Sequence, residues 1–366
     1  MFLVITRNFP PDVGGIQTLM GGLSESLLNH GPVKVFAYAF PNSNHYDSKS
    51  ALNIERIKSI KLFRKYRKAN LVNNFINENH NIRAILTDHW KSLELLNKEY
   101  LDKSKTFCLI HSKEINHKIN SSLNKRLLKS VRKANFIISN SNFTKELAIK
   151  VGIDPSKIRI IFPGIHQPKI IQNQFKIEAE SIFKDSFPKI ITVARLEKRK
   201  GHDKILMLIK NLKTKFPKIK YLSIGSGNEE DNLKKLSKEL SIESEVTFLK
   251  NIEENLKLAL IANSNLFLMP SRIDKNSVEG FGISYIEAAS YGIGSIGGKD
   301  GGASDAILNN KTGLICDGND LNSIYEAVTN FFINDKFNQF GKEAQKFSEN
   351  FHWNKIVKKY LKLINE

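Results

Sequence analysis

The chain has 366 residues, 41% of them hydrophobic and 25% charged, with a formal net charge of +19. This composition excludes a disordered or low-complexity chain, and the length predicts two globular domains rather than one core. No apolar run approaches the length of a membrane-spanning helix, about 18 residues, and the start lacks a signal-peptide pattern, so a cytoplasmic protein is expected. The two cysteines, Cys108 and Cys316, are expected to be buried thiols.

Short β-branched runs alternate with helical patterns through the first half of the chain. The runs predicted as strands are 2–6, 33–39, 84–87, 106–110, 136–139 and 159–162. Helical spacing of apolar residues appears between them, for example over 16–29 and 145–151. This alternation predicts a parallel sheet with helices on both faces.

A second series of the same kind follows a segment without a strand pattern, 166–187. Its predicted strands are 189–193, 221–224, 246–248, 266–269, 294–296 and 313–315. The sequence therefore predicts two doubly wound, Rossmann-like domains over 1–165 and 188–349, joined by a linker over 166–187. Ligands of such domains bind at the carboxyl ends of the strands, so a central cleft that the two domains face is the expected binding place.

Two carboxylates, Glu279 and Glu287, lie eight residues apart across a glycine-rich turn that precedes a helical pattern. A strand, a glycine turn and a helix in that order present free backbone N–H groups to an anion, here around Gly282. Glu279 then lies near the group attached to the anion, and Glu287 is placed to accept from vicinal hydroxyls such as those of a ribose. The alternative is a helix start with one acid nearby and a second, solvated acid.

The stretch 190–203 ends a β-branched run at Arg195 and continues through a basic cluster to Lys200 before the next helical pattern. Cations at the carboxyl end of a parallel strand lie where α/β sheets bind phosphates. We therefore interpret Arg195 and Lys200 as phosphate ligands. Lys198 and Arg199 are interpreted as solvated surface charges.

Positive charge is concentrated in the first 165 residues, which contain 26 Lys and Arg against 12 Asp and Glu. The densest run, 56–68, interleaves seven cations with Ile57, Ile60, Leu62, Phe63 and Tyr66. That pattern is typical of a basic amphipathic segment that contacts an anionic membrane surface. A solvated helix face in a lysine-rich chain is the alternative.

These features follow the order found in the retaining family 4 glycosyltransferases of GT-B fold, and the chain resembles that family over nearly its whole length. The opening Phe-Pro-Pro…Gly-Gly-Ile-Gln and the stretch Val-Glu-Gly-Phe-Gly-Ile are similar to those of bacterial phosphatidylinositol mannosyltransferases and related lipid-glycosylating enzymes. The segments that carry the resemblance are Phe9–Gln17, His111–Glu114, Arg195 with Lys200, Gly225–Gly227, Glu279 with Glu287, Gly301–Gly302 and Lys311–Leu314.

The resemblance implies a hexosyltransferase that moves a mannose-like sugar from a GDP- or UDP-sugar to a lipid-linked or cell-envelope glycan, with retention of configuration. It implies that the donor binds without a metal ion and that no cofactor is used. The first domain is expected to bind the acceptor and the second the nucleotide sugar, with a last helix over about 350–366 packed back on the first. The other expected partner is the anionic inner face of the cytoplasmic membrane, where the protein is peripheral, and no nucleic acid is expected.

Carried over residue by residue, the resemblance implies catalytic roles for His111, Arg195, Lys200 and Glu279. Two departures from the family pattern are Ser112, where a glycine usually follows the histidine, and Asp305, where a glutamate usually follows Gly-Gly. No general base is assigned, because a donor phosphate oxygen is usually favoured as the group that takes the acceptor proton. The residues implied for the donor are Gly15, Arg195, Lys200, Gly225, Glu279, Phe281, Gly282, Ile283 and Glu287, and those for the acceptor are Gly14, Gln17 and His89.

Alternative functions are a GT-B epimerase that acts on the sugar nucleotide itself and an inactive GT-B scaffold protein. The set of Arg195, Lys200, Glu279 and Glu287 matches the transferases better than the epimerases, whereas Asp305 keeps the inactive scaffold open. A nucleic-acid-binding protein is disfavoured, because the chain shows no known module of that class.

Overall fold

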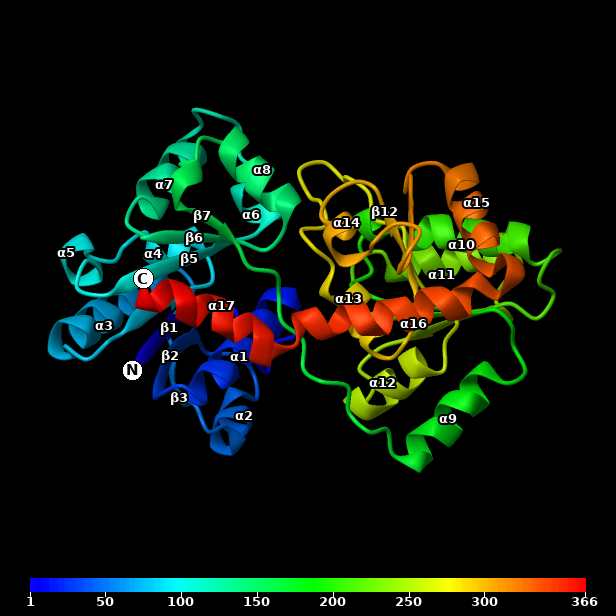
Figure 1. Cartoon of the computed structure of the whole chain (residues 1–366), viewed down its shortest axis with the longest axis horizontal. Helices are drawn as coiled ribbons and strands as arrows, with labels where there is room; N and C mark the ends of the chain where they lie inside the picture. The colour runs from blue at the N-terminus through cyan, green and yellow to red at the C-terminus, as the bar shows by residue number, and fades with distance from the viewer. The chain divides into compact units, whose positions relative to one another are not determined.

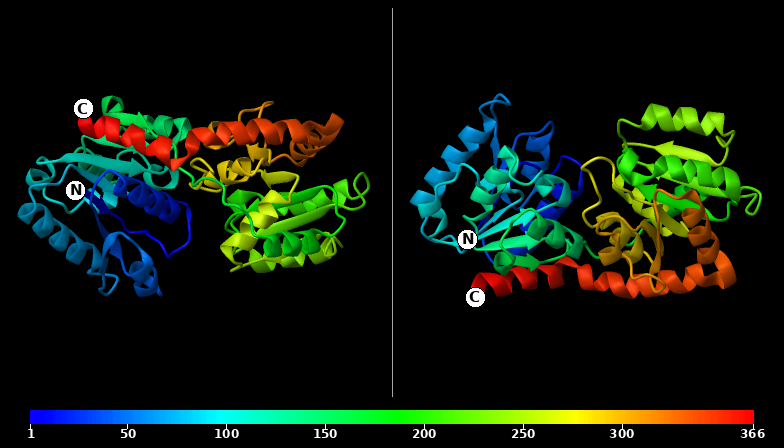
Figure 2. Two further views of the ribbon diagram at one scale, coloured as in Figure 1. Left: turned by 60° about the horizontal axis from the view of Figure 1, so that its bottom comes forward. Right: turned by 90° about the horizontal axis from the view of Figure 1, so that it is seen from above.

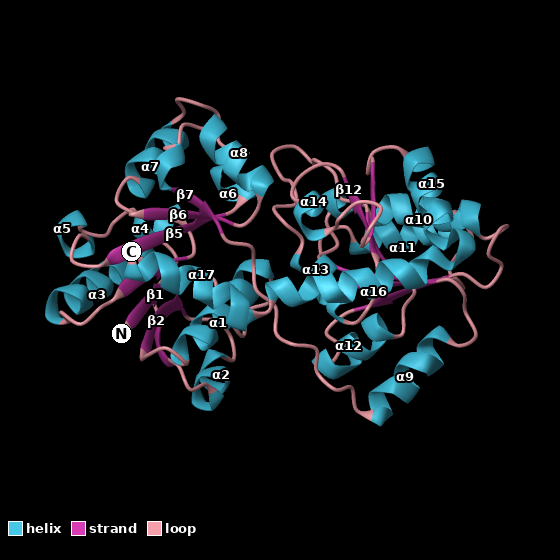
Figure 3. Ribbon diagram, viewed as in Figure 1, coloured by secondary structure: helices cyan, strands magenta, loops and turns pink.

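The structure is a computed structural model that describes all residues, 1–366. The chain divides into two compact units (Figure 1). Unit 1 comprises Met1–His166 together with His352–Glu366, and unit 2 comprises Gln167–Phe351. In each unit helices surround a parallel sheet (Figure 3). The prediction of two doubly wound, Rossmann-like domains is therefore confirmed.

Unit 1 contains a seven-stranded parallel sheet in the order β3-β2-β1-β4-β5-β6-β7. Its strands are β1 (Phe2–Ile5), β2 (Val33–Tyr38), β3 (Asn53–Ile57), β4 (Ala84–Thr87), β5 (Lys105–Ile110), β6 (Phe136–Ser139) and β7 (Ile158–Ile160). Its helices before the final segment are α1 (Gly15–Leu28), α2 (Ser43–Lys49), α3 (Arg64–Glu78), α4 (Trp90–Leu93), α5 (Lys98–Leu101), α6 (Ser112–Ile115), α7 (Ser122–Val131), α8 (Asn142–Lys150) and the 3₁₀ turn η1 (Pro155–Lys157).

The core of unit 1 lies on both faces of this sheet, because neighbouring side chains of a strand point in opposite directions. In β1, Leu3 and Ile5 enter one buried apolar cluster, whereas Phe2 and Val4 enter the other. All four side chains are fully buried. This explains why β1 is apolar at every position rather than at alternate positions.

The last helix, α17 (Trp353–Asn365), packs on α1 of unit 1 (Figure 2). Its residues Trp353, Ile356 and Tyr360 complete the apolar cluster on that face of the sheet. Trp353 lies against two glycines, and a Cβ atom at Gly22 would be 2.2 Å from its Nε1, while one at Gly164 would be 2.4 Å from its Cδ2. The indole fits only because neither position carries a side chain.

Unit 2 contains a six-stranded parallel sheet in the order β10-β9-β8-β11-β12-β13. The strands are β8 (Lys189–Val193), β9 (Lys220–Ile224), β10 (Val246–Leu249), β11 (Leu266–Met269), β12 (Ser295–Gly298) and β13 (Gly313–Cys316). Its helices are α9 (Asn173–Phe183), α10 (His202–Leu212), α11 (Glu230–Glu239), α12 (Glu254–Ala262), α13 (Ile283–Ser290), α14 (Ala303–Ala306), α15 (Leu321–Phe332) and α16 (Lys336–Ser348), with the 3₁₀ turns η2 (Lys198–Lys200), η3 (Ile333–Asp335) and η4 (Glu349–Phe351).

Each sheet has one place where the direction of strand addition reverses. In unit 1 the chain builds β1, β2 and β3 toward one edge and then crosses to β4 on the other side of β1. In unit 2 it builds β8, β9 and β10 and then crosses to β11 on the other side of β8. Ligands of doubly wound sheets bind outside the carboxyl ends of the strands at such a point. Binding is therefore expected after β1 and β4, and after β8 and β11.

Two segments differ from their sequence predictions. The predicted linker, 166–187, contains helix α9, which packs on α12. The sequence prediction misses strand β3, because it is a partly exposed edge strand of mixed composition whose last two residues begin the basic run 56–68. Both cysteines are buried free thiols, as predicted. None of the helices combines the length and the apolar character needed to span a membrane.

Candidate functional site

The reversal point of unit 2 gathers residues from the segments that follow β8 and β11. After β8 the chain forms the 3₁₀ turn η2, which directs the side chains of Arg199 and Lys200 inward, so that each residue is only 8% exposed. After β11, Arg272 donates its backbone N–H to the carbonyl oxygen of Arg199 at 2.8 Å. This bond joins the two segments directly at the carboxyl edge of the sheet.

Glu279 is the carboxylate at the centre of this cluster. Its Oε2 accepts from the Arg199 guanidinium at 2.7 Å and also from the Lys200 ammonium. Arg199 donates through Nε to Glu197 at 2.8 Å, and Glu197 in turn accepts from Arg195 at 2.8 Å. The five side chains alternate in charge, so the cluster is held by charge-assisted hydrogen bonds throughout.

Burial and pairing act against each other on these groups. Burial by itself would raise the pKa of Glu279, but the cations of Lys200 and Arg199 outweigh it and lower that pKa to about 2. Burial lowers the pKa of Lys200 despite the neighbouring Glu279 carboxylate. Burial acts in the same sense on Arg199, yet the carboxylates of Glu279 and Glu197 raise its pKa. Glu279 is therefore ionised, and two buried cations share its one charge.

This cluster corrects one interpretation made from the sequence. The sequence interpretation of Arg199 as a solvated surface charge is wrong, because Arg199 is buried and bonded to both Glu197 and Glu279. Arg195, interpreted as a phosphate ligand, has 59% of its side chain exposed and reaches the cluster only through Glu197. The sequence feature that could have identified Arg199 as a site residue is its position next to Lys200, because both residues belong to the turn that follows β8.

Helix α13 begins at this edge of the sheet, as the glycine-rich pattern predicted. Its N-cap, Gly282, has φ 88°, a left-handed conformation that favours glycine. Ile283 is the first helical residue, and the ring of Phe281 is buried against Phe351. The backbone N–H groups of the first turn of α13 therefore begin four residues after Glu279 in the chain.

Glu287 lies in the middle of α13 and is half-buried. Burial would lower the pKa of Lys257 on α12, but the carboxylates of Glu287 and then Glu254 raise it. Glu287 thus faces α12, a different neighbour from that of Glu279. The two acids predicted as a pair belong to one turn and helix but have separate partners.

Two glycines near the cluster lie so close to the backbone of another segment that neither position has room for a side chain. A Cβ atom at Gly225, after β9, would be 2.0 Å from the carbonyl oxygen of Ala194. One at Gly302 would be 2.0 Å from the carbonyl oxygen of Gly280, and the N–H of Gly302 donates to the carbonyl oxygen of Glu279 at 2.9 Å. Asp305, which replaces the glutamate of the family pattern, lies in the first turn of α14 directly after this contact.

In unit 1 the reversal point carries Asp88 and His89 directly after β4, and His111 directly after β5. His111 donates through Nε2 to the backbone carbonyl oxygen of Asp88 at 3.1 Å. Burial, and then the neighbouring His89, lower the pKa of His111, so its ring is neutral. A carbonyl oxygen can only accept, which assigns the proton to Nε2 and leaves Nδ1 unprotonated.

His89, which the resemblance implies for the acceptor, is the N-cap residue of helix α4. It is only 2% exposed, and both ring nitrogens are bonded: Nδ1 accepts from the Lys91 backbone N–H at 2.9 Å, and Nε2 donates to Glu114 at 2.6 Å. The hydrogen bond from His89 is the main reason that the pKa of Glu114 falls to about 2. Glu114 keeps 30% of its side chain exposed. The residue that reaches solvent here is therefore Glu114, and His89 orients it.

The segment after β1 leads into α1 through Gly14, its N-cap, and Gly15, its first residue. A Cβ atom at Gly14 would be 2.5 Å from the side-chain oxygen of Gln17. Gln17 donates its side-chain N–H to Asp12. The predicted acceptor residues Gly14 and Gln17 thus lie together at the exit of β1, at the same sheet edge as Asp88.

The basic run 56–68, interpreted from the sequence as a basic amphipathic segment, is divided between the end of β3, a loop and the start of α3, and only part of it is exposed. Arg56 belongs to β3 and is bonded to Asp47 at 2.7 Å, and Ile57 is part of the core. Lys68 is buried in α3. The part that remains exposed is the loop after β3 with the first turn of α3, which we call the 58–67 segment.

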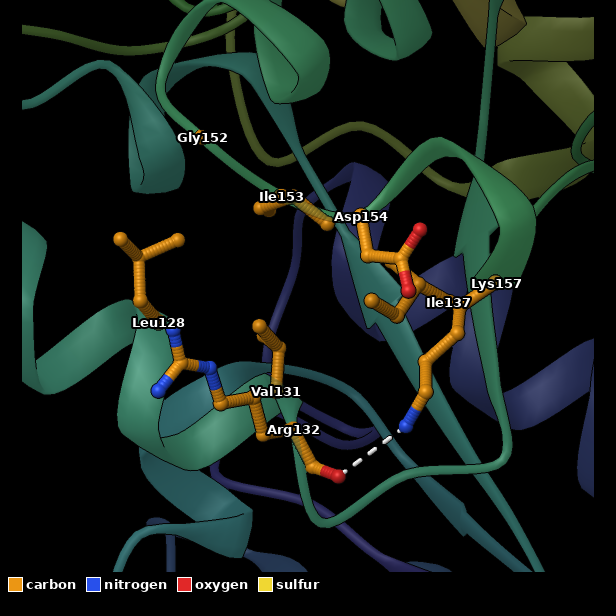
Figure 4. Close-up of a pocket in the computed structure, with 8 residues that line it drawn as sticks. All are labelled: Leu128, Val131, Arg132, Ile137, Gly152, Ile153, Asp154 and Lys157. Carbon is orange, nitrogen blue, oxygen red and sulfur yellow. Dashed lines mark hydrogen bonds between the residues drawn. The ribbon is translucent and has the colours of Figure 1, made fainter.

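Two cavities, one in each unit, lie away from these residues. The cavity in unit 1 has a volume of about 270 Å³ and is shown in Figure 4. It lies beside the starts of β6 and β7, at the opposite edge of the sheet from His111. The cavity in unit 2 lies before β11 and before β12. No group of three or more His, Cys, Asp or Glu side chains is arranged to hold a metal ion.

Comparison with known proteins shows the family. Residues 173–350 match the model of glycosyl transferases group 1, and residues 13–167 match that of glycosyltransferase family 4. The chain is 23% identical over 338 residues to a GDP-mannose-dependent α-(1-6)-phosphatidylinositol monomannoside mannosyltransferase of Mycolicibacterium smegmatis, covering 89% of this chain and 87% of that one.

Solved structures with the same fold extend over the whole chain. The Anabaena protein HepE in complex with UDP superposes with a TM-score of 0.82 at 16% identity and covers 100% of both chains. Sucrose-phosphate synthase from Thermosynechococcus elongatus has a TM-score of 0.80 at 18% identity, covering 100% of this chain and 98% of that one. The chain belongs to the family 4 glycosyltransferases and has their GT-B fold.

Proposed function

We propose that the protein transfers a mannose-like hexosyl group from a nucleoside diphosphate sugar to a lipid-linked or cell-envelope glycan, with retention of configuration and without a metal ion. The observation that carries this proposal is the buried cluster in which Arg199 and Lys200 share Glu279 at the reversal point of the unit 2 sheet. With Arg195 and Glu197, the cluster contains three cations and two carboxylates, which leaves an excess positive charge where a ligand of this fold binds.

The chemistry of sugar transfer uses this charge. The bond from the anomeric carbon to the diphosphate breaks as the leaving oxygen gains negative charge, and preorganised cations stabilise that charge without reorganising solvent. The backbone N–H groups in the first turn of α13 add to the positive electrostatic potential of these cations. Glu279, already ionised and anchored through Oε2, is then the acceptor for hydroxyl groups of the transferred sugar. Glu287, further along the helix, accepts hydrogen bonds from the ribose hydroxyl groups of the nucleotide.

The relatives support the donor class. The Mycolicibacterium smegmatis relative is described as GDP-mannose-dependent, and HepE was crystallised with UDP and with UDP-glucose. A nucleoside diphosphate sugar is the common element. We favour mannose as the sugar, because the relative that spans 89% of this chain is a mannosyltransferase.

The 58–67 segment supports an acceptor at a membrane surface. It exposes Ile60, Leu62, Phe63 and Tyr66, with 73% of Leu62 accessible. Among and beside them lie the exposed cations Lys58, Lys61, Lys65 and Arg67. Apolar side chains surrounded by cations match the boundary between anionic headgroups and acyl chains, and each cation contributes about 1 kcal/mol there. We infer that this segment holds the enzyme on the inner face of the cytoplasmic membrane.

Isothermal calorimetry with GDP and UDP in excess EDTA tests the donor site. We expect one of the two nucleotides to bind the folded protein in the absence of metal ions. Hydrolysis of GDP-mannose and UDP-glucose under the same conditions, followed by NMR of the released sugar, then identifies the donor. A folded protein that binds neither nucleotide in EDTA, or binds only after Mg²⁺ is added, contradicts the proposal.

A further inference from the structure

Lys68 is a fully buried lysine in unit 1 that the proposed chemistry does not use. Only 3% of the residue is exposed, and its Nζ donates to the Ser92 hydroxyl at 3.0 Å and to the Thr6 carbonyl oxygen at 3.5 Å. Its ammonium also lies 4.8 Å from the centre of the Tyr38 ring. Lys68 thus extends from α3 into the carboxyl edge of the sheet, where β1 and β4 end.

A chain of hydrogen bonds leads from Lys68 to His111. Ser92, which accepts from Lys68, donates its hydroxyl proton to the Asp88 carboxylate at 2.7 Å. The other carboxylate oxygen of Asp88 accepts the backbone N–H of Arg7 at 2.9 Å. The backbone carbonyl of Asp88 then accepts from His111 Nε2 at 3.1 Å. Asp88 is therefore tied to α3, to the exit of β1 and to the histidine.

Stability alone is a poor explanation for this arrangement. Removing an ammonium and a carboxylate from water costs several kcal/mol each, and apolar residues of similar volume often stabilise a core as well or better. The groups facing Lys68 include one carboxylate, Asp88, and one further cation, Arg7. The pKa of Lys68 falls to about 8 because of burial, with Asp88 opposing and Arg7 assisting. Burying these two charged groups is costly, which points to a role in geometry.

We propose that Lys68 and Ser92 are positioning residues that act through Asp88 to hold the ring of His111 in one orientation and one tautomer. With Nε2–H committed to the Asp88 carbonyl, the neutral ring presents Nδ1 as a hydrogen-bond acceptor. In the proposed transfer reaction, on which this inference rests, that nitrogen accepts a hydrogen bond from a substrate hydroxyl group, and the hydroxyl keeps its proton. Lys68 itself touches no substrate.

The Ser92→Ala variant tests the chain with the least disturbance, because it removes the bridging hydroxyl and keeps both charges. Lys68→Met tests it from the other end. Asn74→Ala, at an exposed position of the same helix, is the matched control. Nitrogen-15 NMR of the histidine rings, assigned with a His111→Gln variant, reports the tautomer of His111 directly and requires no substrate.

We expect the wild type and Asn74→Ala to show His111 with Nε2 protonated and one set of resonances. In Ser92→Ala and Lys68→Met, the His111 signals should shift or split between tautomers. Hydrolysis of the nucleotide sugar should fall in kcat by about 10-fold to 100-fold with its KM unchanged, as expected for a displaced reacting group.

Unchanged His111 resonances in folded Ser92→Ala overturn the inference, whatever the activity. If Lys68→Met does not fold, Ser92→Ala decides alone. The NMR result is independent of nucleotide binding in unit 2, which calorimetry measures separately. A failure of this inference is therefore distinguishable from a failure of the proposed function.

Discussion

Replacing Arg199 with alanine should weaken donor binding, lower the stability of unit 2 at pH 7 and reduce the dependence of that stability on acid pH. In the native cluster Glu279 faces two cations, and its pKa is about 2 against an ordinary value of 4.5. Because the pKa in the folded state is lower, Glu279 stabilises the fold above pH 4.5, and this contribution is lost as the pH falls toward 2. The difference corresponds to about 3 kcal/mol, shared between Lys200 and Arg199.

Without Arg199, Glu279 keeps only Lys200 as a cationic partner. We expect the free energy of unfolding at pH 7 to fall by about 1.5 to 3 kcal/mol, the range of one hydrogen bond to a charged group. The pKa of Glu279 should rise, so the loss of stability between pH 4.5 and 2 becomes smaller. Urea unfolding at a series of pH values measures both quantities. Lys198→Ala, an exposed neighbour in the same turn, is the matched control.

Donor affinity gives the second measurement. Once Lys200 and Glu279 form a simple pair, the excess positive charge at the site is gone, and nucleotide binding should weaken by about 1.5 to 3 kcal/mol. This corresponds to a roughly 10-fold to 150-fold higher dissociation constant in calorimetry with GDP or UDP. If Arg199→Ala and Lys198→Ala give the same affinity and the same acid unfolding curve, Arg199 does not act through this cluster.

Three further outcomes are expected. Glu287→Ala should mainly raise the dissociation constant of the nucleotide, whereas Glu279→Ala should mainly lower kcat, and steady-state kinetics with the reverse pattern would exchange the two roles. Binding to vesicles should increase with their anionic lipid content and decrease with salt, because ions screen the charges of the 58–67 segment. Replacing Leu62 and Phe63 with serine should reduce co-sedimentation with those vesicles and leave nucleotide binding unchanged. If this variant and the wild type sediment equally, the segment does not bind the membrane, and a soluble acceptor becomes the better proposal. Raising the pH from 8 to 10.5 should increase the contribution of Lys68 to the free energy of unfolding, because its pKa in the folded state, about 8, is below the ordinary value of 10.5. The Lys68→Met variant should lack this increase when the free energy is measured by urea unfolding.

The sequence alone determined the two doubly wound domains. Apolar runs such as 2–6 and 266–269 are local signals, because a parallel strand that is buried on both faces must be apolar along its whole length. The glycine-rich turn before Ile283 is also local, because the left-handed conformation of Gly282 depends on its own backbone. The strand, turn and helix at Glu279 could therefore be predicted without knowledge of any distant contact.

Only the tertiary structure decided which charged residues are buried. Lys198 and Arg199 are adjacent basic residues in the sequence. Only Arg199 is buried, because Glu279, eighty residues later, follows the neighbouring strand of the sheet and pairs with it. Lys68 looks like one more member of a basic run, and it is buried because Ser92 and Asp88 follow β4. A charge is buried only where a distant partner offsets its loss of hydration, and that partner is set by strand order, which periodicity along the chain does not contain.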